Sequence, residues 1–286
     1  MHEGAKDHDD PEPTARNDAA HRTPNVNTLD VDGLRVLHAS PRGGARPPVL
    51  FVHGYFADAT IWTDWLEFFA SRGVSAYAVH LRGRANSKRE THLGRTSIED
   101  FVDDAEAAAR AVGAATVVGH SMGGLIAQKL AERGAVDAAV LITPAPPRGI
   151  TVMSPRLAIA QLKYLPAILT SRVVYPARED LRSLVLNRVP AVEQDALLDR
   201  LVPDSGRAGR DMSLTGVPVN PSRVRCPLLL IGAADDRFIP RSIAARIAKR
   251  YAVPLETAEH HGHMVIVEPD WQSIAGRVER WIRERT

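Results

Sequence analysis

The fold is decided by the stretch Thr116-Val117-Val118-Gly119-His120-Ser121-Met122-Gly123-Gly124. A short apolar run leads into a G-x-S-x-G pentapeptide, and a helical pattern from Leu125 to Arg133 follows it. In such a strand–turn–helix the serine lies on a sharp turn, and the flanking glycines leave room for its raised side chain. The stretch therefore predicts that Ser121 is a catalytic nucleophile. The alternative is a serine that merely caps the helix.

Segments typical of strands and helices alternate on both sides of this turn. Apolar runs predict buried strands at Val49–His53, Ala76–Val79, Ala115–Gly119, Ala138–Thr143 and Pro227–Gly232. An Asp-Gly turn between Thr28 and Ala39 predicts a preceding hairpin, and Ser97 opens a helical pattern that runs to about Val112. Alternating strands and helices predict βαβ units. We therefore expect an α/β fold with a mostly parallel sheet flanked by helices.

The alternation pauses after Pro144, and residues 150–222 show helical periodicity without a clear buried strand. This pattern predicts an inserted helical cap at residues 148–222, within a core formed by residues 28–147 and 223–286. Residues 1–27 contain almost no large apolar side chains, so burial cannot offset the entropy lost on ordering them. They are predicted to form a flexible N-terminal tail.

A serine hydroxyl needs a base to accept its proton and a carboxylate to orient that base. Two adjacent carboxylates, Asp235 and Asp236, follow the apolar run that ends at Gly232, which places both at the carboxyl end of the sheet. The candidate bases come later and are His260, His261 and His263. No Cys or acidic cluster stands near these histidines at metal-ligand spacing, so no metal site is predicted.

Acyl transfer at a serine also needs two N–H donors for the oxyanion. One is predicted to be the backbone N–H of Met122, directly after the nucleophile. The other should come from the loop after His53-Gly54, with the Tyr55 N–H as first choice and the Phe56 N–H as second. His53 itself is expected to hold this loop or pack within it rather than to act as a base.

In order and spacing, these motifs resemble those of the capped α/β-hydrolase superfamily of esterases, lipases and related enzymes. The resemblance covers the chain from about residue 28 to its end. It rests on His53-Gly54, Leu81-Arg82-Gly83 with Ser87, the pentapeptide, Gly232…Asp236…Pro240 and Gly262-His263. The D-x-x-x-P spacing favours Asp236 over Asp235, and the Gly-His pair favours His263. Arg84-Ala85-Asn86 departs from the family, since many relatives carry a short His-containing turn there.

The resemblance implies a serine hydrolase without a cofactor. Haloalkane dehalogenases and epoxide hydrolases of this fold carry Asp at the nucleophile position, so Ser121 argues against both. The serine implies an acyl-enzyme formed from an ester, thioester, lactone or amide, with carboxylic esters ranked first by analogy. One alternative is a non-hydrolytic member of the fold, such as a lyase or a catalyst of cofactor-free oxygenation or perhydrolysis. Another is an inactive ligand-binding module, against which the complete Ser–Asp–His set argues.

A cap over the catalytic face predicts a small-molecule substrate with an apolar acyl or alcohol part. The candidate lining residues are Met153, Leu157, Ile159, Leu162, Tyr164, Leu165 and Ile168, which at helical spacing could also be simple packing residues. Arg148 could meet an anionic substrate group, although a structural or solvated arginine is the more ordinary interpretation.

The composition excludes several other classes. The net charge is +2, with 36 basic and 34 acidic residues interspersed, so neither a nucleic acid nor an anionic membrane is an expected partner. No apolar run reaches the length of a transmembrane helix, and the N-terminus lacks the pattern of a secretory signal. The single cysteine, Cys226, cannot form an intramolecular disulfide and is expected to be structural. We therefore expect a cytoplasmic protein, whose oligomeric state the sequence does not predict.

Overall fold

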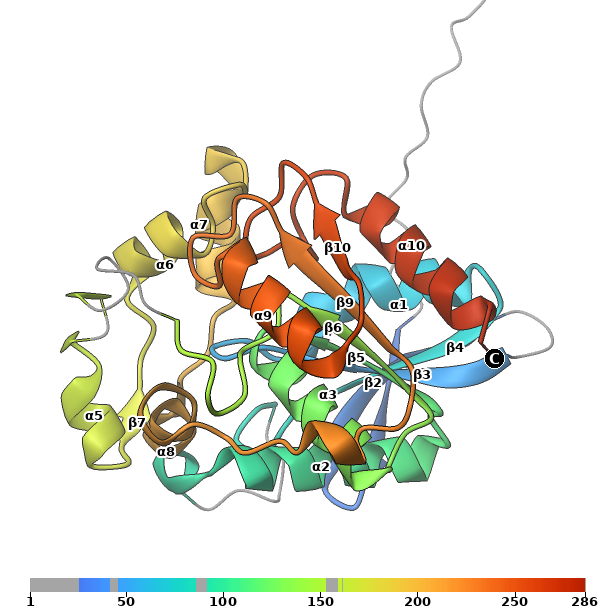
Figure 1. Cartoon of the computed structure of the whole chain (residues 1–286), viewed down its shortest axis with the longest axis horizontal. Helices are drawn as coiled ribbons and strands as arrows, with labels where there is room; N and C mark the ends of the chain where they lie inside the picture. Colours follow the sequence, from blue (N-terminus) through green and yellow to red (C-terminus); the bar gives the residue numbers. More distant parts are fainter. Residues whose placement is uncertain (1–25, 42–45, 86–91, 153–158, 161, 286) are drawn as a thin grey trace, which may run out of the picture.

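The computed structural model describes residues 26–41, 46–85, 92–152, 159–160 and 162–285. The strands of its main sheet are β1 (Asn27–Val31), β2 (Leu34–Ala39), β3 (Arg46–Val52), β4 (Val74–Val79), β5 (Thr116–His120), β6 (Ala138–Ile142), β9 (Leu228–Ala233) and β10 (Leu255–Ala258). They lie in the order β1-β2-β4-β3-β5-β6-β9-β10 (Figure 1). The pairs β1/β2 and β2/β4 are antiparallel, and all others are parallel. This confirms the predicted α/β class with a mostly parallel sheet.

The central strands are apolar throughout because both faces of the sheet are covered. In β3, Val49 and Phe51 pack into the core on one face, whereas Leu50 and Val52 pack into the core on the other. All four side chains are fully buried. Successive side chains of a strand point to opposite faces, so a strand between two helical layers needs a continuous apolar run.

Helices cover the two faces in the pattern expected of βαβ units (Figure 1). The first helical layer consists of α1 (Thr63–Ala70) and α10 (Trp271–Arg283), and the second of α2 (Ile98–Val112), α3 (Met122–Arg133) and α9 (Arg241–Tyr251). Helix α2 begins where the sequence predicts, because Ser97 and Asp100 form a reciprocal capping box. The side chain of Trp65 in α1 packs edge-on against Phe51 of the sheet.

The described part of the segment between β6 and β9 contains further helices. These are α5 (Leu165–Leu169), α6 (Arg178–Leu184), α7 (Ala191–Asp199), α8 (Gly206–Arg210), a π-helix at Asp211–Thr215 and a 3₁₀-helix at Pro221–Arg223. Helices α5 to α8 gather on the left of Figure 1, beside the sheet. The segment also contains an antiparallel pair that the sequence interpretation missed, β7 (Val173–Val174) with β8 (Asp204–Ser205). Two-residue strands are too short to produce a periodic pattern.

Residues 1–25 of the predicted tail lie outside the described residues, and β1 begins at Asn27, the last residue of that tail. Cys226 is partly buried, and this burial raises the pKa of its thiol. Among helices formed by the described residues, none has both the length and the apolar character needed to cross a bilayer.

Candidate active site

Ser121 lies on a strained turn between β5 and α3. Its backbone has φ 55° and ψ −116°, a conformation that non-glycine residues rarely adopt. A Cβ atom on Gly119 would lie 2.1 Å from the carbonyl oxygen of Gly123, and one on Gly123 would lie 2.1 Å from that of Val52. Glycine is therefore required at both positions. The Ser121 side chain makes no capping bond to α3, all of whose residues are described, so the helix-cap alternative is wrong.

The structure brings Ser121, His263 and Asp236 together in a buried chain of hydrogen bonds. His263 Nε2 lies 2.9 Å from Ser121 Oγ, and His263 Nδ1 lies 2.8 Å from Asp236 Oδ2. The other oxygen of Asp236 accepts hydrogen bonds from the backbone N–H groups of Phe238 and Ile239, at 2.8 and 2.7 Å. A carboxylate on Nδ1 holds the neutral imidazole in the tautomer whose Nε2 accepts the serine proton.

The neighbouring candidates point elsewhere. Asp235 forms an ion pair with Arg188 rather than contacting His263. Both ring nitrogens of His261 face backbone carbonyls, those of Glu259 at 2.8 Å and Pro269 at 3.0 Å. Within the described part of the chain, no three His, Cys, Asp or Glu side chains are grouped as metal ligands would be.

The two backbone N–H groups predicted to bind an oxyanion belong to segments on two sides of Ser121. Met122 begins α3, so its N–H has no acceptor within the helix and lies at the positive end of the helix dipole. A Cβ atom on Gly54 would lie 3.1 Å from Ser121 Cβ, so the loop after β3 passes close to Ser121. The Phe56 N–H already donates to Asp204 Oδ2 at 2.9 Å, which removes the second choice for this donor. The Tyr55 N–H has no hydrogen-bond partner among the described residues.

Residues that sequence reasoning left without a role hold the backbone of His263. The His120 Nε2–H donates to the carbonyl oxygen of His263 at 2.8 Å, and Thr143 Oγ1 donates to the same oxygen at 3.2 Å. Glu268 accepts from the Gly262 N–H at 2.7 Å. Burial, and to a smaller extent the nearby ring of His263, lower the pKa of His120 to about 3. His120 is therefore a neutral hydrogen-bond donor, which its place within the nucleophile motif could have suggested.

The lowered pKa of His120 predicts a loss of stability in acid. As the pH falls below about 6.5, the unfolded chain gains a proton at this residue while the folded protein stays unprotonated until near pH 3. Stability present above pH 6.5 is therefore lost as the pH falls. Relative to His120→Gln, which keeps a donor but does not titrate, the wild-type protein should lose about 2 kcal/mol more between pH 7 and pH 5. Urea unfolding at both pH values measures this difference, and equal losses in the two proteins would contradict it.

A cavity of about 400 Å³ opens onto Ser121 and His263. Its insertion-derived apolar lining includes Ile168, Val174, Leu181, Leu184, Val185 and Leu201. Of the predicted lining residues, Tyr164 and Ile168 are present and Leu165 is not, while Met153 and Leu157 lie outside the described residues. The prediction that Ile159 and Leu162 line the cavity is wrong, because these residues are 68% and 64% exposed. Helical spacing identifies an apolar face without specifying what that face meets.

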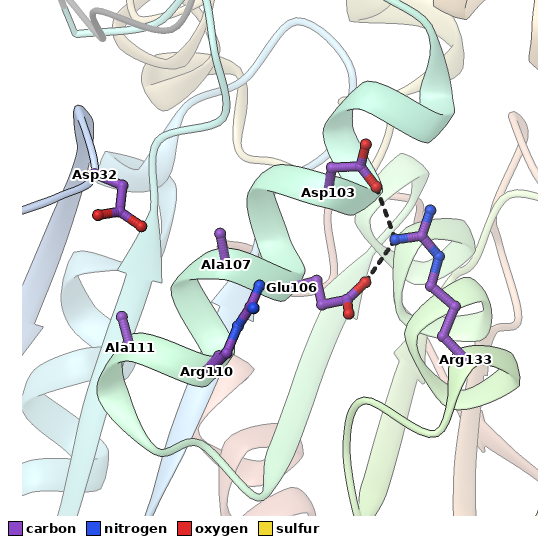
Figure 2. A pocket seen from close by; sticks show the side chains of 7 residues that line it. All are labelled: Asp32, Asp103, Glu106, Ala107, Arg110, Ala111 and Arg133. Atoms are coloured by element: carbon purple, nitrogen blue, oxygen red, sulfur yellow. Dashed lines mark hydrogen bonds and ion pairs between the residues drawn. The ribbon is translucent and has the colours of Figure 1, made fainter.

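Arg148 and a charged hollow over α2 make no contact with Ser121, His263 or Asp236 among the described hydrogen bonds and ion pairs. Arg148 lies at the rim of the cavity, and its Nε–H donates to the carbonyls of Thr215 and Gly216, which gives it a structural role. Figure 2 shows a separate hollow over α2, where Arg133 forms ion pairs with Asp103 at 2.7 Å and Glu106 at 2.5 Å. Its described lining contains no Ser, Thr, Cys or His side chain.

Comparisons with known proteins agree with this fold. The sequence model described as "Alpha/beta hydrolase family" matches residues 49–272. A curated relative, the dihydrolipoyllysine-residue acetyltransferase component of an acetoin cleaving system from Cupriavidus necator, is 37% identical over 107 residues, which are 36% of this chain and 27% of that protein. The chain thus spans about a quarter of that relative's length.

Two solved structures share the fold over most of their length. A monoacylglycerol lipase from Paleococcus ferrophilus has a TM-score of 0.68 and 21% identity, covering 88% of this chain and 99% of that one. An N-acyl homoserine lactonase has a TM-score of 0.68 and 18% identity, covering 92% of this chain and 97% of that one. At these identities the likeness concerns the fold alone.

Proposed function

The chain belongs to the alpha/beta hydrolase family, and we propose that it is a serine hydrolase that cleaves carboxylic esters through an acyl-enzyme on Ser121. The observation that carries this proposal is the buried hydrogen-bond chain from Ser121 through His263 to Asp236. The described part of the site supplies a nucleophile, a base and a carboxylate that orients the base, and acyl transfer needs all three. Thioesters and lactones undergo the same chemistry and are included in the proposal.

The reaction proceeds in two halves. Ser121 Oγ attacks the ester carbonyl carbon while His263 Nε2 takes its proton, and the carbonyl oxygen becomes an oxyanion held by the N–H groups of Tyr55 and Met122. The intermediate collapses, the bond to the alkoxy oxygen breaks, and His263 returns the proton to the departing alcohol. A water molecule then attacks the acyl group, again losing its proton to His263. The bond between the acyl carbon and Ser121 Oγ then breaks, His263 returns the proton to Oγ, and the acid leaves.

The cavity supports a substrate with an apolar acyl or alcohol part. Its volume of about 400 Å³ lies within the ordinary range for small-molecule sites, and side chains of α5, α6 and α7 form much of its apolar wall. We propose on this basis that residues 148–222 act as a cap over Ser121. The two structural relatives are a monoacylglycerol lipase and an N-acyl homoserine lactonase, and both names refer to molecules with an acyl group.

Fluorophosphonate labelling tests the proposed nucleophile and the apolar cavity together. Folded protein should gain one phosphonyl adduct on the peptide that contains Ser121, detected by mass spectrometry, because a serine activated by His263 attacks phosphorus. A reagent with a long alkyl arm should label faster than one with a methyl arm, because the cavity wall is apolar. Denatured protein and the His263→Ala variant are the controls and should label much more slowly. Folded wild-type protein that gains no adduct on Ser121 would refute the acyl-enzyme.

A further inference from the structure

The residue that follows the proposed oxyanion donor is held in a strained conformation by the inserted segment. Phe56 has φ 63°, in the left-handed region that is unfavourable for a bulky side chain. Its N–H donates to Asp204 Oδ2 at 2.9 Å, and its carbonyl oxygen accepts from the Val202 N–H at 3.0 Å. Both backbone groups of Phe56 are therefore bound by residues 202–204, far away in the sequence.

The Asp204 carboxylate is itself fully buried and charge-paired. Its second oxygen accepts from the Ser205 N–H at 2.7 Å, and Arg84 Nη2 forms an ion pair with the first. Arg84 is equally buried, donates from Nη1 to the carbonyl oxygen of Arg82 at 2.9 Å, and lies 4.8 Å above the ring of Phe101. Buried charges persist only when paired and hydrogen-bonded, so Arg84 and Asp204 require one another.

Ser205, the next residue of β8, binds Tyr55, the residue that carries the proposed oxyanion donor. Tyr55 Oη donates to the carbonyl oxygen of Ser205 at 2.7 Å, while the Ser205 hydroxyl lies 2.5 Å from the carbonyl oxygen of Thr96. Strand β8 thus binds Tyr55 through its side chain and Phe56 through its backbone. Arg84 stands in the turn where this sequence departs from its relatives. In the structure this arginine neutralises the carboxylate that accepts the Phe56 N–H.

We propose that Asp204, neutralised by Arg84, is a positioning residue of the oxyanion hole. By binding the Phe56 N–H, Asp204 fixes the turn at Tyr55 and Phe56. This turn directs the N–H of the Gly54–Tyr55 peptide toward the reacting carbonyl. The proposal rests on the proposed function, since an oxyanion forms only if Ser121 attacks an acyl carbon. It makes the inserted segment part of the catalytic machinery as well as a covering over the cavity.

Two neutral double variants isolate the hydrogen bond from the ion pair. Arg84→Gln with Asp204→Asn removes both charges and leaves an amide oxygen to accept the Phe56 N–H. Arg84→Gln with Asp204→Leu removes both charges and that acceptor, with a side chain of nearly the same shape. The leucine variant should have a kcat about 100-fold below the asparagine variant, with KM within about threefold, as for loss of one oxyanion donor. Its affinity for an alkyl trifluoromethyl ketone, whose adduct on Ser121 carries an oxyanion, should fall by the same factor.

Controls separate this role from stability and from the proposed function. Ile274→Ala, in α10 and outside the described lining of the cavity, should lower the urea midpoint without changing kcat or ketone affinity. Equal kcat and ketone affinity in the two double variants would overturn the positioning role.

If either double variant fails to fold, amide exchange in the wild-type protein decides the question. The Phe56 N–H should then be strongly protected, and exchange as fast as in an unfolded peptide would overturn the proposal. Absence of wild-type ester turnover and of a Ser121 adduct would instead refute the hydrolase function.

Discussion

Replacing Ser121 with alanine is expected to abolish ester turnover, with kcat falling by roughly 10⁴- to 10⁶-fold. The Oγ atom is the only group within 2.9 Å of His263 Nε2 that the described hydrogen bonds provide, so no other hydroxyl can take over the attack. The residual rate should be that of binding and oxyanion stabilisation alone. Initial rates with a p-nitrophenyl ester of medium chain length measure the effect, and the cavity should still bind the substrate.

A matched control removes a buried hydroxyl away from the cavity. Ser75 lies in β4, is buried, and does not line the cavity, so Ser75→Ala should keep turnover within about twofold of the wild-type value. The Ser121→Ala protein should remain folded, because the turn also depends on Gly119 and Gly123, which are unchanged. Undiminished ester hydrolysis by a folded Ser121→Ala protein would end the acyl-enzyme proposal.

Replacing Asp236 with asparagine is expected to lower kcat by about 10⁴-fold. The carboxylate accepts the Nδ1–H of His263 at 2.8 Å, whereas an amide nitrogen in its place would donate to Nδ1 and move the ring proton to Nε2. An Nε2 that carries a proton cannot accept the Ser121 hydroxyl, so the base is lost although the geometry is kept. Because the effect is on the chemical step, KM should change much less than kcat.

The adjacent carboxylate provides the control for this second result. Asp235→Asn removes a partly exposed ion pair with Arg188, and exposed pairs contribute about 0–1 kcal/mol. Its kcat should therefore stay within a few-fold of the wild-type value under the same assay. A large loss in Asp235→Asn together with a small loss in Asp236→Asn would transfer the orienting role to Asp235.

The sequence predicted those parts of the fold that depend on local chemistry. Apolar runs such as Val49–Val52 indicated strands covered on both faces, and the capping box at Ser97 marked the first turn of α2 correctly. The two-stranded pair β7/β8 escaped prediction because two residues per strand carry no period. The lining of the cavity was predicted poorly. Ile159 and Leu162 have helical spacing, yet their side chains face solvent, while α6 and α7 supply side chains such as Leu184 and Leu197.

The candidate site also has features that the sequence predicts and features that only packing decides. The sequence by itself determined the strained turn at Ser121, because glycines at 119 and 123 and an apolar strand before them leave few other conformations. It also determined the order in which Ser121, Asp236 and His263 follow one another in the chain. Each of these inferences uses residues close together in sequence, or the rule that parallel strands end at one edge of the sheet.

Only the tertiary structure showed that the Phe56 N–H already has an acceptor and that Arg84 has a charged partner. The Phe56 N–H is bound to Asp204, 148 positions later in the chain, and Arg84 is paired with the same carboxylate across 120 positions. A sequence pattern shows which residues can donate or accept, but not which of them the packed chain brings within hydrogen-bonding distance. That choice is made by packing, because a buried charge or N–H must find its partner wherever the fold places one.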